Sequence, residues 1–220
     1  MLPIRMLYPL VSADVALFSV EQNRLRVLLV QRVQEPAALA WALPGAILKP
    51  DEDEDLHATA CRALHEKISV AIPHLAQVGT FSGARRDPRG WSISVLFYAL
   101  LPCDQINAVV NSRIEAVEWL DVGDLGRPLA FDHSLLLGVA LDVLRGKVER
   151  HALPLHLLPE RFTLTALQRT CEAVLGRPLD KSVFRRRLKD SEDIVELVGE
   201  FVLGAQRPAQ LYRVREGFVF

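Results

Sequence analysis

A nearly unbroken apolar run at residues 91–101 constrains the fold of this chain most strongly. It reads WSISVLFYALL and lies between Arg89-Gly90 and Pro102. A run this apolar, without alternation of polar and apolar residues, is typical of a strand buried on both faces. We therefore predict a sheet whose central strand is covered on both sides.

Further strands and two helices are predicted around this run. Residues 11–20 and 25–31 are apolar and β-branched, and the polar residues between them predict a hairpin. Residues 115–120 form a shorter strand, and residues 56–69 a helix. Asp132 is expected to cap a second helix that ends at Gly146 and has an apolar stripe of Leu135, Leu136, Val139, Ala140 and Val143. This order predicts a mixed sheet between helices.

The pattern changes after about residue 150. Residues 147–160 contain two prolines and two histidines without periodicity. We place a domain boundary there, giving domains 1–150 and 151–220. Residues 1–150 hold 15 Lys and Arg against 18 Asp and Glu, whereas residues 151–220 hold 11 against 9. This shift in charge suggests different partners for the two domains.

The second domain has the element order of a winged helix-turn-helix. Thr163 is the expected N-cap of a helix that ends near Leu175 at Gly176, with Leu167, Cys171 and Val174 facing inward. Asp180 caps a second helix over residues 181–190. Two strands follow, the first containing Val195 to Val202 and the second spanning residues 210–214. In this motif the second helix enters the major groove of DNA.

The second of these helices separates an apolar side from a basic side. At 100° per residue, Phe184 and Leu188 share one side, opposite a basic one. Basic side chains there suit phosphates and guanine edges. A solvated basic face, or a tail that binds protein instead of DNA, would give the same pattern. The candidate DNA-binding residues are Lys181, Ser182, Arg185, Arg186 and Lys189 on the helix, and Arg207, Gln210, Tyr212 and Arg213 in the hairpin.

A turn and a helix in the first domain have the outline of a catalytic motif. The sequence WALPG at 41–45 precedes an acidic run at 51–55 and the predicted helix. The segment resembles the Nudix hydrolase signature, Gly-x5-Glu-x7-Arg-Glu-Leu-x-Glu-Glu-x-Gly-apolar. Aligned on Arg62 and Leu64, it places Glu54 at the first acidic position, and Gly45 two or three residues too early, which implies a short insertion. The retained positions are Gly45, Glu54, Arg62, Leu64 and Glu66.

The carboxylates that define the catalytic motif are partly replaced. In the Nudix family, carboxylates at three positions on one helix face hold a pyrophosphate-bound Mg²⁺. Here those positions are Ala63, Glu66 and Lys67. One carboxylate beside an ammonium attracts a divalent cation poorly. We therefore expect a retained fold without catalytic residues, metal or cofactor.

Two alternatives to a degenerate Nudix motif remain open. The chain could be an active Mg²⁺-dependent hydrolase of ADP-ribose or a related nucleoside diphosphate, with residues 51–55 supplying the missing carboxylates. The helix could also be an ordinary amphipathic one whose acidic N-terminal run suits the helix dipole.

Combined with the winged helix, these motifs resemble the Nudix-related transcriptional regulators of the NrtR family over nearly the whole chain. The segments RDPRGW at 86–91, AFDH at 130–133 and RPAQLY at 207–212 add to the resemblance. It implies a ligand-responsive regulator of NAD metabolism or sugar use, expected here to be a repressor. The expected partners are double-stranded operator DNA, an effector that is ADP-ribose, NAD-related or sugar-derived, and a second copy of the chain in a homodimer.

The resemblance also implies an effector pocket. Arginines can clamp a diphosphate, and aromatic rings can stack on a base. Trp91 serves equally well as a core anchor, and His133 as a helix-start residue. The implied lining is Arg32, Arg85, Arg86, Arg89, Trp91, Phe131 and His133.

The cysteines and the N-terminus suggest a cytoplasmic protein. Cys61, Cys103 and Cys171 are odd in number and far apart, as suits reduced thiols. The first twenty residues are interrupted by Arg5 and Asp14, so neither a signal peptide nor a membrane span is expected.

Overall fold

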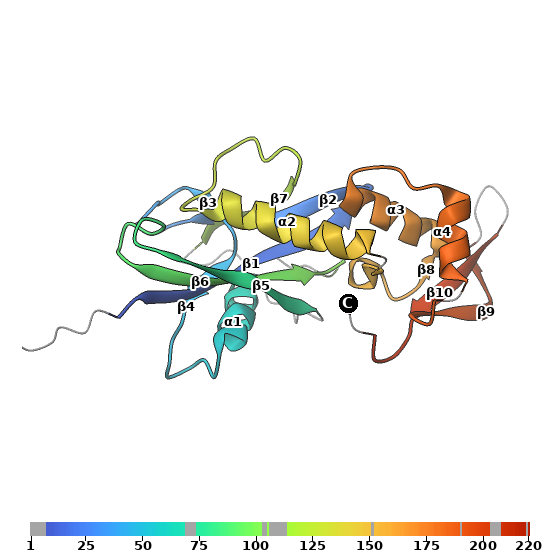
Figure 1. Cartoon of the computed structure of the whole chain (residues 1–220), viewed down its shortest axis with the longest axis horizontal. Coiled ribbons are helices and arrows are strands. Elements are labelled where there is room, and N and C mark those ends of the chain that lie inside the picture. The colour runs from blue at the N-terminus through green and yellow to red at the C-terminus, as the bar shows by residue number, and fades with distance from the viewer. Residues whose placement is uncertain are drawn as a thin grey trace, which may run out of the picture.

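The protein consists of a mixed β-sheet with helices on both faces and a smaller helical and β unit beside it. The computed structural model describes residues 8–68, 74–102, 105, 114–150, 152–189, 191–202, 208–218 and 220. Figure 1 shows an elongated molecule with the sheet at one end and the smaller unit at the other. The predicted fold class, an α/β/α sandwich followed by a winged helix-turn-helix, is confirmed.

The large sheet is organised about two parallel central strands, β1 (Leu10–Glu21) and β6 (Ser92–Leu100). All of β6 except Ile93 is buried, as its apolar run predicts. The remaining pairs are antiparallel. The order is β3 (Trp41–Ala42), β2 (Arg24–Arg32), β1, β6 and β5 (Leu75–Gly83), while β4 (Gly45–Ile47) pairs with β1 and β7 (Ile114–Asp121) pairs with β2.

The sequence patterns located the apolar strands but missed β3, β4 and β5. The predicted hairpin is present, and its turn residues Gln22 and Asn23 have φ of 51° and 60°, as in a two-residue type I′ turn. Strand β5 lies at the sheet edge and is interrupted by a bulge between Gln77 and Gly79. A bulge inserts an extra residue and shifts the alternation by which a strand is recognised. The short β3 and β4 offer too few residues for a periodic pattern.

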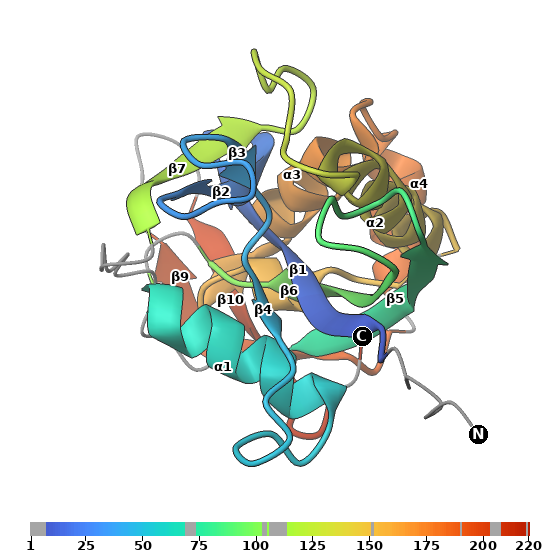
Figure 2. The ribbon, with the colours of Figure 1, turned by 90° about the vertical axis from the view of Figure 1, so that its left-hand side faces the viewer.

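Helices α1 (Leu56–Ile68) and α2 (His133–Glu149) cover opposite faces of the large sheet (Figures 1 and 2). The predicted apolar stripe of α2 is wrong by about one position, because Leu135 is 59% exposed. The predicted end at Gly146 is also wrong, since the buried face, and with it the helix, continues. The buried residues of α2 are His133, Leu136, Leu137, Ala140, Leu144 and Val148.

The smaller unit confirms the predicted helix caps. It contains α3 (Leu164–Leu175), α4 (Lys181–Leu188) and an antiparallel sheet in the order β8 (Phe162–Thr163), β10 (Ala209–Val214), β9 (Ile194–Val202). Thr163 Oγ1 accepts the Ala166 N–H at 3.1 Å, and Asp180 Oδ1 accepts the Val183 N–H at 2.8 Å. Gly176 ends α3 with a left-handed φ of 69°. Helix α4 ends at Leu188, two residues earlier than predicted.

The two units share one continuous hydrophobic core. The segment that we expected to be an open boundary contains a 3₁₀ turn, η2 (Leu155–Leu157). Leu153, Leu155 and Leu157 are buried there between α2 and α3 residues. Cys171 of α3 is a free, buried cysteine in the same core, Cys61 is free and exposed, and Cys103 lies outside the described residues.

No helix in the described ranges is long and apolar enough to cross a membrane.

An aromatic cluster joins the two units. His74, just before β5, stacks on His156 with ring centroids 4.9 Å apart and meets the Phe220 ring edge-on at 5.5 Å. Lys147 Nζ lies 4.9 Å from the centroid of that Phe220 ring and donates to the Phe220 carbonyl at 3.0 Å. Burial, with the charges of His156 and Lys147, lowers the pKa of His74 to about 4. The His74 ring is therefore neutral at neutral pH.

We expect acidification from pH 7.5 to pH 5.0 to destabilise the fold through His74. The pKa of this ring is about 4 when folded against about 6.5 when unfolded. The unfolded chain therefore binds more protons between those values, and falling pH favours unfolding. His74→Phe keeps a ring against His156 and should reduce the fall in Tm measured by scanning calorimetry. His65→Phe, at an exposed position of α1, should keep the wild-type fall; equal falls in all three proteins would contradict the assignment.

Candidate functional site

A pocket of about 410 Å³ opens among β1, β2, β4, the later turns of α1 and the start of α2. Most of the predicted effector residues line it, namely Arg32, Arg86, Arg89, Phe131 and His133. Arg85 lines a second pocket of about 320 Å³, which shares Arg86 and Phe131 with the first. Trp91 lines neither of these two pockets, and half of its surface is exposed, so it is not a core anchor.

Two of the predicted effector-binding arginines are held by carboxylates. Arg86 donates to both oxygens of Asp132 at 3.0 and 2.9 Å, and Arg89 to both oxygens of Asp87 at 3.0 and 2.7 Å. Asp132 was expected to cap α2, but its side chain makes no capping hydrogen bond. Its carboxylate is engaged by Arg86 instead. These bidentate pairs fix the directions of both guanidinium groups.

Arg32 differs from its neighbours because, in the part of the chain that the structure describes, no carboxylate forms an ion pair with it. Its Nε donates to the Pro36 carbonyl at 3.1 Å, and its guanidinium lies 4.9 Å from the centroid of the Phe131 ring. Phe131 adopts a left-handed φ of 55°, which is uncommon for an aromatic residue. Burial, followed by the charge of Arg89, lowers the pKa of Arg32. An anionic ligand would relieve this unfavourable environment.

A buried polar cluster forms part of the pocket wall. His133 Nδ1 accepts the Leu43 N–H at 3.0 Å. The ring is almost fully buried, and burial lowers its pKa, so it is neutral with its proton on Nε2. Nε2 lies 3.7 Å from Asp14 Oδ1. Asp14 Oδ2 accepts hydrogen bonds from the Ser94 hydroxyl at 2.5 Å and the Ser12 hydroxyl at 3.4 Å.

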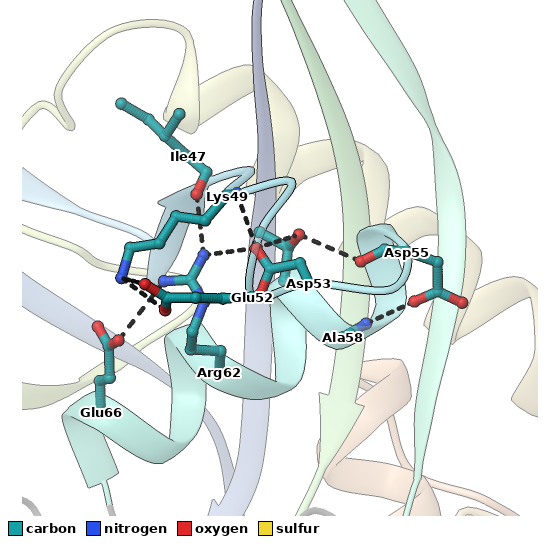
Figure 3. Close-up of polar contacts among 9 residues, drawn as sticks. Ile47, Lys49, Glu52, Asp53, Asp55, Ala58, Arg62 and Glu66 are labelled. Atoms are coloured by element: carbon teal, nitrogen blue, oxygen red, sulfur yellow. Dashed lines mark hydrogen bonds and ion pairs between the residues drawn. The ribbon is translucent and has the colours of Figure 1, made fainter.

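Arg62 holds the loop that precedes α1 (Figure 3). Its Nε and Nη2 donate to the two oxygens of Asp53, each at 2.7 Å, and Nη2 also donates to the Ile47 carbonyl at 2.9 Å. The hydrogen bonds from Arg62 hold the pKa of Asp53 well below its usual range. This loop therefore packs against α1 through a buried, ionised pair.

The alignment placed Glu54 at the first acidic position of the motif, but its side chain is exposed, and Asp53 instead forms the ion pair with Arg62. A turn in which the Asp53 N–H donates to the Lys49 carbonyl at 2.8 Å directs Asp53 inward. Asp55 Oδ1 accepts the Ala58 N–H at 2.7 Å and so caps α1 (Figure 3). Glu54 lies between two anchored carboxylates and faces solvent, a direction that residue spacing alone does not determine.

The other motif positions are divided between core and pocket. Ala63 and Leu64 are fully buried. Glu66 lines the pocket, and its Oε1 lies 3.5 Å from Arg62 Nη1. The side chain of Lys67 lies outside the described part of the structure. Within that part, no group of three His, Cys, Asp or Glu side chains is placed to hold a metal ion.

Helix α4 presents the predicted basic side to solvent. Phe184 and Leu188 are buried against the smaller unit's core. The opposite side of α4 carries the exposed residues Lys181, Ser182, Arg186 and Lys189. Arg185 is half-buried and donates to Thr165 Oγ1 at 3.1 Å, which ties it to α3.

The hairpin residues predicted to contact DNA lie in different environments. Gln210 was predicted to contact DNA, but its side chain is used inside the hairpin. Its Nε2 donates to the carbonyls of Glu200 and Leu211, both at 3.0 Å. Its donors are thus used to hold the bulge between β9 and β10. Tyr212 is half-buried, Arg213 is exposed, and Arg207 lies outside the described residues.

Sequence reasoning missed the carboxylates of the pocket. Asp87 and Asp132 lie in the two segments that carry the family resemblance, next to arginine and histidine residues that were selected. Asp14 had its own signal, since it is the ionisable residue in the middle of the apolar strand 11–20. A carboxylate at such a position needs a specific partner or function.

Comparison with known proteins identifies related families and structures. Residues 154–214 match the family model described as the NrtR DNA-binding winged helix domain, and residues 10–136 match that of the NUDIX domain. The ADPR responsive transcriptional repressor NtrR of Acinetobacter baylyi is 42% identical over 206 residues, which cover 93% of this chain and 82% of that protein.

Two crystal structures of Shewanella oneidensis NrtR are similar to this chain. The structure complexed with a 27mer DNA has a TM-score of 0.82 and 36% identity, covering 93% of each chain. The NUDIX domain complexed with ADP ribose has a TM-score of 0.60 and 36% identity, covering 64% of this chain and 92% of that one.

Proposed function

The chain belongs to the NrtR family of Nudix-related transcriptional regulators, and on this basis we propose that it is a DNA-binding repressor whose Nudix domain binds ADP-ribose as its effector. In this proposal residues 1–150 bind the effector, and residues 151–220 bind operator DNA. The observation that carries it is the presence, in one chain, of an arginine-lined pocket and an exposed basic α4 in a winged helix. A homodimer would read two half-sites separated by about 34 Å or a multiple of it.

The pocket suits a ligand with a diphosphate at its centre. Arg32, Arg86 and Arg89 line the same cavity, and each guanidinium presents several donors. The pairs with Asp132 and Asp87 occupy part of the donors of Arg86 and Arg89 and orient the rest. Arg32 has no such pair among the described residues, so a phosphate would supply its counter-charge.

We also propose that the protein does not hydrolyse its effector. The helix position of Ala63 is apolar and buried, and Glu66 lies beside the Arg62 guanidinium. Three of the five carboxylates in the acidic run are engaged, because Asp53 is bound to Arg62, Glu52 is bound to Lys49 and Asp55 caps α1. Mg²⁺ needs several hard oxygen ligands in octahedral geometry. These carboxylates are engaged elsewhere.

Titration of an operator duplex tests both parts of this function. The operator would first be selected from a random DNA library with the full chain. Saturating ADP-ribose should then change operator affinity about 5- to 150-fold, the range of typical allosteric coupling. Fluorescence anisotropy measures the affinity and the number of protomers bound. An operator affinity that is insensitive to ADP-ribose would contradict the regulator assignment.

The same samples test for hydrolysis. Incubation of the protein with ADP-ribose and Mg²⁺ or Mn²⁺ should leave the ligand intact, as followed by chromatography of AMP. AMP formation that is abolished by Glu66→Gln would show that the protein is an enzyme.

A further inference from the structure

Asp14 is a buried carboxylate in the arginine-lined pocket. It lies in the middle of β1, only 6% exposed, and lines the same cavity as Arg32 and Arg89. A carboxylate there repels phosphate and so weakens the binding of the ligand group that the arginines attract. Its presence therefore needs a reason other than phosphate binding.

The two oxygens of Asp14 differ in their hydrogen-bond donors. Oδ2 accepts hydrogen bonds from the hydroxyls of Ser94 and Ser12. No donor among the described residues lies within hydrogen-bonding distance of Oδ1, and the nearby His133 Nε2 is 3.7 Å away. Oδ1 can therefore accept a hydrogen bond from a ligand or from water.

The space beside Oδ1 is kept open by a glycine. Gly45 pairs with Asp14 across β1 and β4, and a Cβ at Gly45 would lie 2.0 Å from Oδ1 and 3.0 Å from the Ala13 carbonyl. Any larger residue would displace the carboxylate. Gly45 and Asp14 both line the pocket, so the vacant acceptor faces the cavity.

The backbone around Asp14 also fixes the position of this oxygen. Asp14 pairs with Leu96 of β6 on one side and with Gly45 of β4 on the other, so it lies inside the sheet. The hydroxyl of Ser94, two residues from Leu96 on β6, holds Oδ2. Oδ1 is thus a pre-positioned acceptor, which reduces the entropy lost on binding.

We propose that Asp14 Oδ1 accepts a hydrogen bond from a ribose hydroxyl of the effector and selects a ribosyl group at this end of the pocket. The inference rests on the proposed function and names the part of the ligand that the arginines do not explain. Hydroxyls donate to a carboxylate, whereas an ionised phosphate has no proton to donate. The pocket then combines donors for a diphosphate with a pre-positioned acceptor for a sugar hydroxyl, the pattern of a nucleoside diphosphate sugar.

Calorimetric titration with ADP-ribose, ADP and 2′,3′-dideoxy-ADP tests this inference. The wild-type protein should bind a ligand that carries the recognised ribose at least about tenfold more tightly than the analogue that lacks those hydroxyls. This is the difference in affinity expected from one hydrogen bond to a charged group. Asp14→Asn should remove that preference. If the terminal ribose is bound, the lost preference is for ADP-ribose over ADP. If the adenosine ribose is bound, the lost preference is for ADP over dideoxy-ADP.

The sign of the change separates recognition from simple electrostatics. Removal of the Asp14 charge alone would tighten binding of all three anions. The inference requires weaker binding of the hydroxyl-bearing ligand instead. Asp142→Asn, at an exposed carboxylate of α2 that lines neither pocket, is the control and should keep the wild-type preferences.

Three outcomes bear on the inference differently. Preferences that Asp14→Asn leaves unchanged would overturn it. If that variant fails to fold by thermal melting, the wild-type titrations still decide, because equal affinities within both ligand pairs would also overturn it. Absence of wild-type binding to all three ligands would instead contradict the proposed function.

Discussion

The double substitution Arg186→Ala/Lys189→Ala should weaken operator binding by at least about thirtyfold. Each contact to a base or phosphate contributes about 1–3 kcal/mol, so two lost contacts cost about 2–6 kcal/mol. Both side chains are exposed on α4, opposite the buried Phe184 and Leu188. Their removal should therefore leave the fold intact. Anisotropy with the selected operator and a thermal melt measure the two effects.

Arg185 is a less informative target than these residues because its guanidinium also donates to Thr165 Oγ1 of α3. Its substitution would mix a structural change with a loss of DNA contact. The control Arg24→Ala/Arg127→Ala removes the same charge from the first domain. If the control weakens binding as much as the α4 variant does, the effect comes from overall charge and α4 is not the recognition helix. Affinity should also fall steeply with salt in wild type and less steeply in the α4 variant.

Arg32→Ala should reduce ADP-ribose affinity by about 10- to 100-fold, because a hydrogen bond to a charged group contributes about 1.5–3 kcal/mol. Arg32 is the pocket arginine that forms no ion pair within the described residues, so its charge is available to the ligand. Operator affinity without the effector should be unchanged, while the response to ADP-ribose shifts to higher concentrations. Calorimetry and anisotropy measure these two quantities.

Two further variants sharpen the Arg32 prediction. Arg32→Lys should restore only part of the affinity, because an ammonium lacks the planar fork that binds two phosphate oxygens. Arg127→Ala is the matched control, since Arg127 also stacks on an aromatic ring, with its guanidinium 4.8 Å from the Trp41 centroid, but lines neither pocket. Wild-type affinity in Arg32→Ala would show that the diphosphate does not reach this residue.

Local signals in the sequence predicted much of the fold. The apolar run of β6, the caps at Thr163 and Asp180, and the glycine that ends α3 each depend on residues within a few positions of one another. Such signals failed where another interaction competed. Asp132 binds Arg86 instead of capping α2, and Gly146 does not end α2 because the buried face continues to Val148.

The candidate site was predictable only in part. The selected arginines reach one pocket, but sequence spacing placed Glu54 where the structure has Asp53, because a turn at Lys49 sets which carboxylate points inward. Gln210 was a candidate because of its place in the hairpin, which does not reveal that its amide is used inside that hairpin.

The sequence by itself determined the two-domain α/β and winged-helix organisation, the basic side of α4 and the loss of helix carboxylates at Ala63 and Lys67. Tertiary structure alone decided which charges in the pocket are satisfied. The contacts that decide this join Arg86 to Asp132, Asp14 to Ser94 and Leu43 to His133, which are 46, 80 and 90 residues apart. Electrostatic and hydrogen-bonding partners are chosen by distance in space. That the described residues offer Arg32 no ion pair and Asp14 Oδ1 no donor therefore becomes visible only when the sheet brings these segments together.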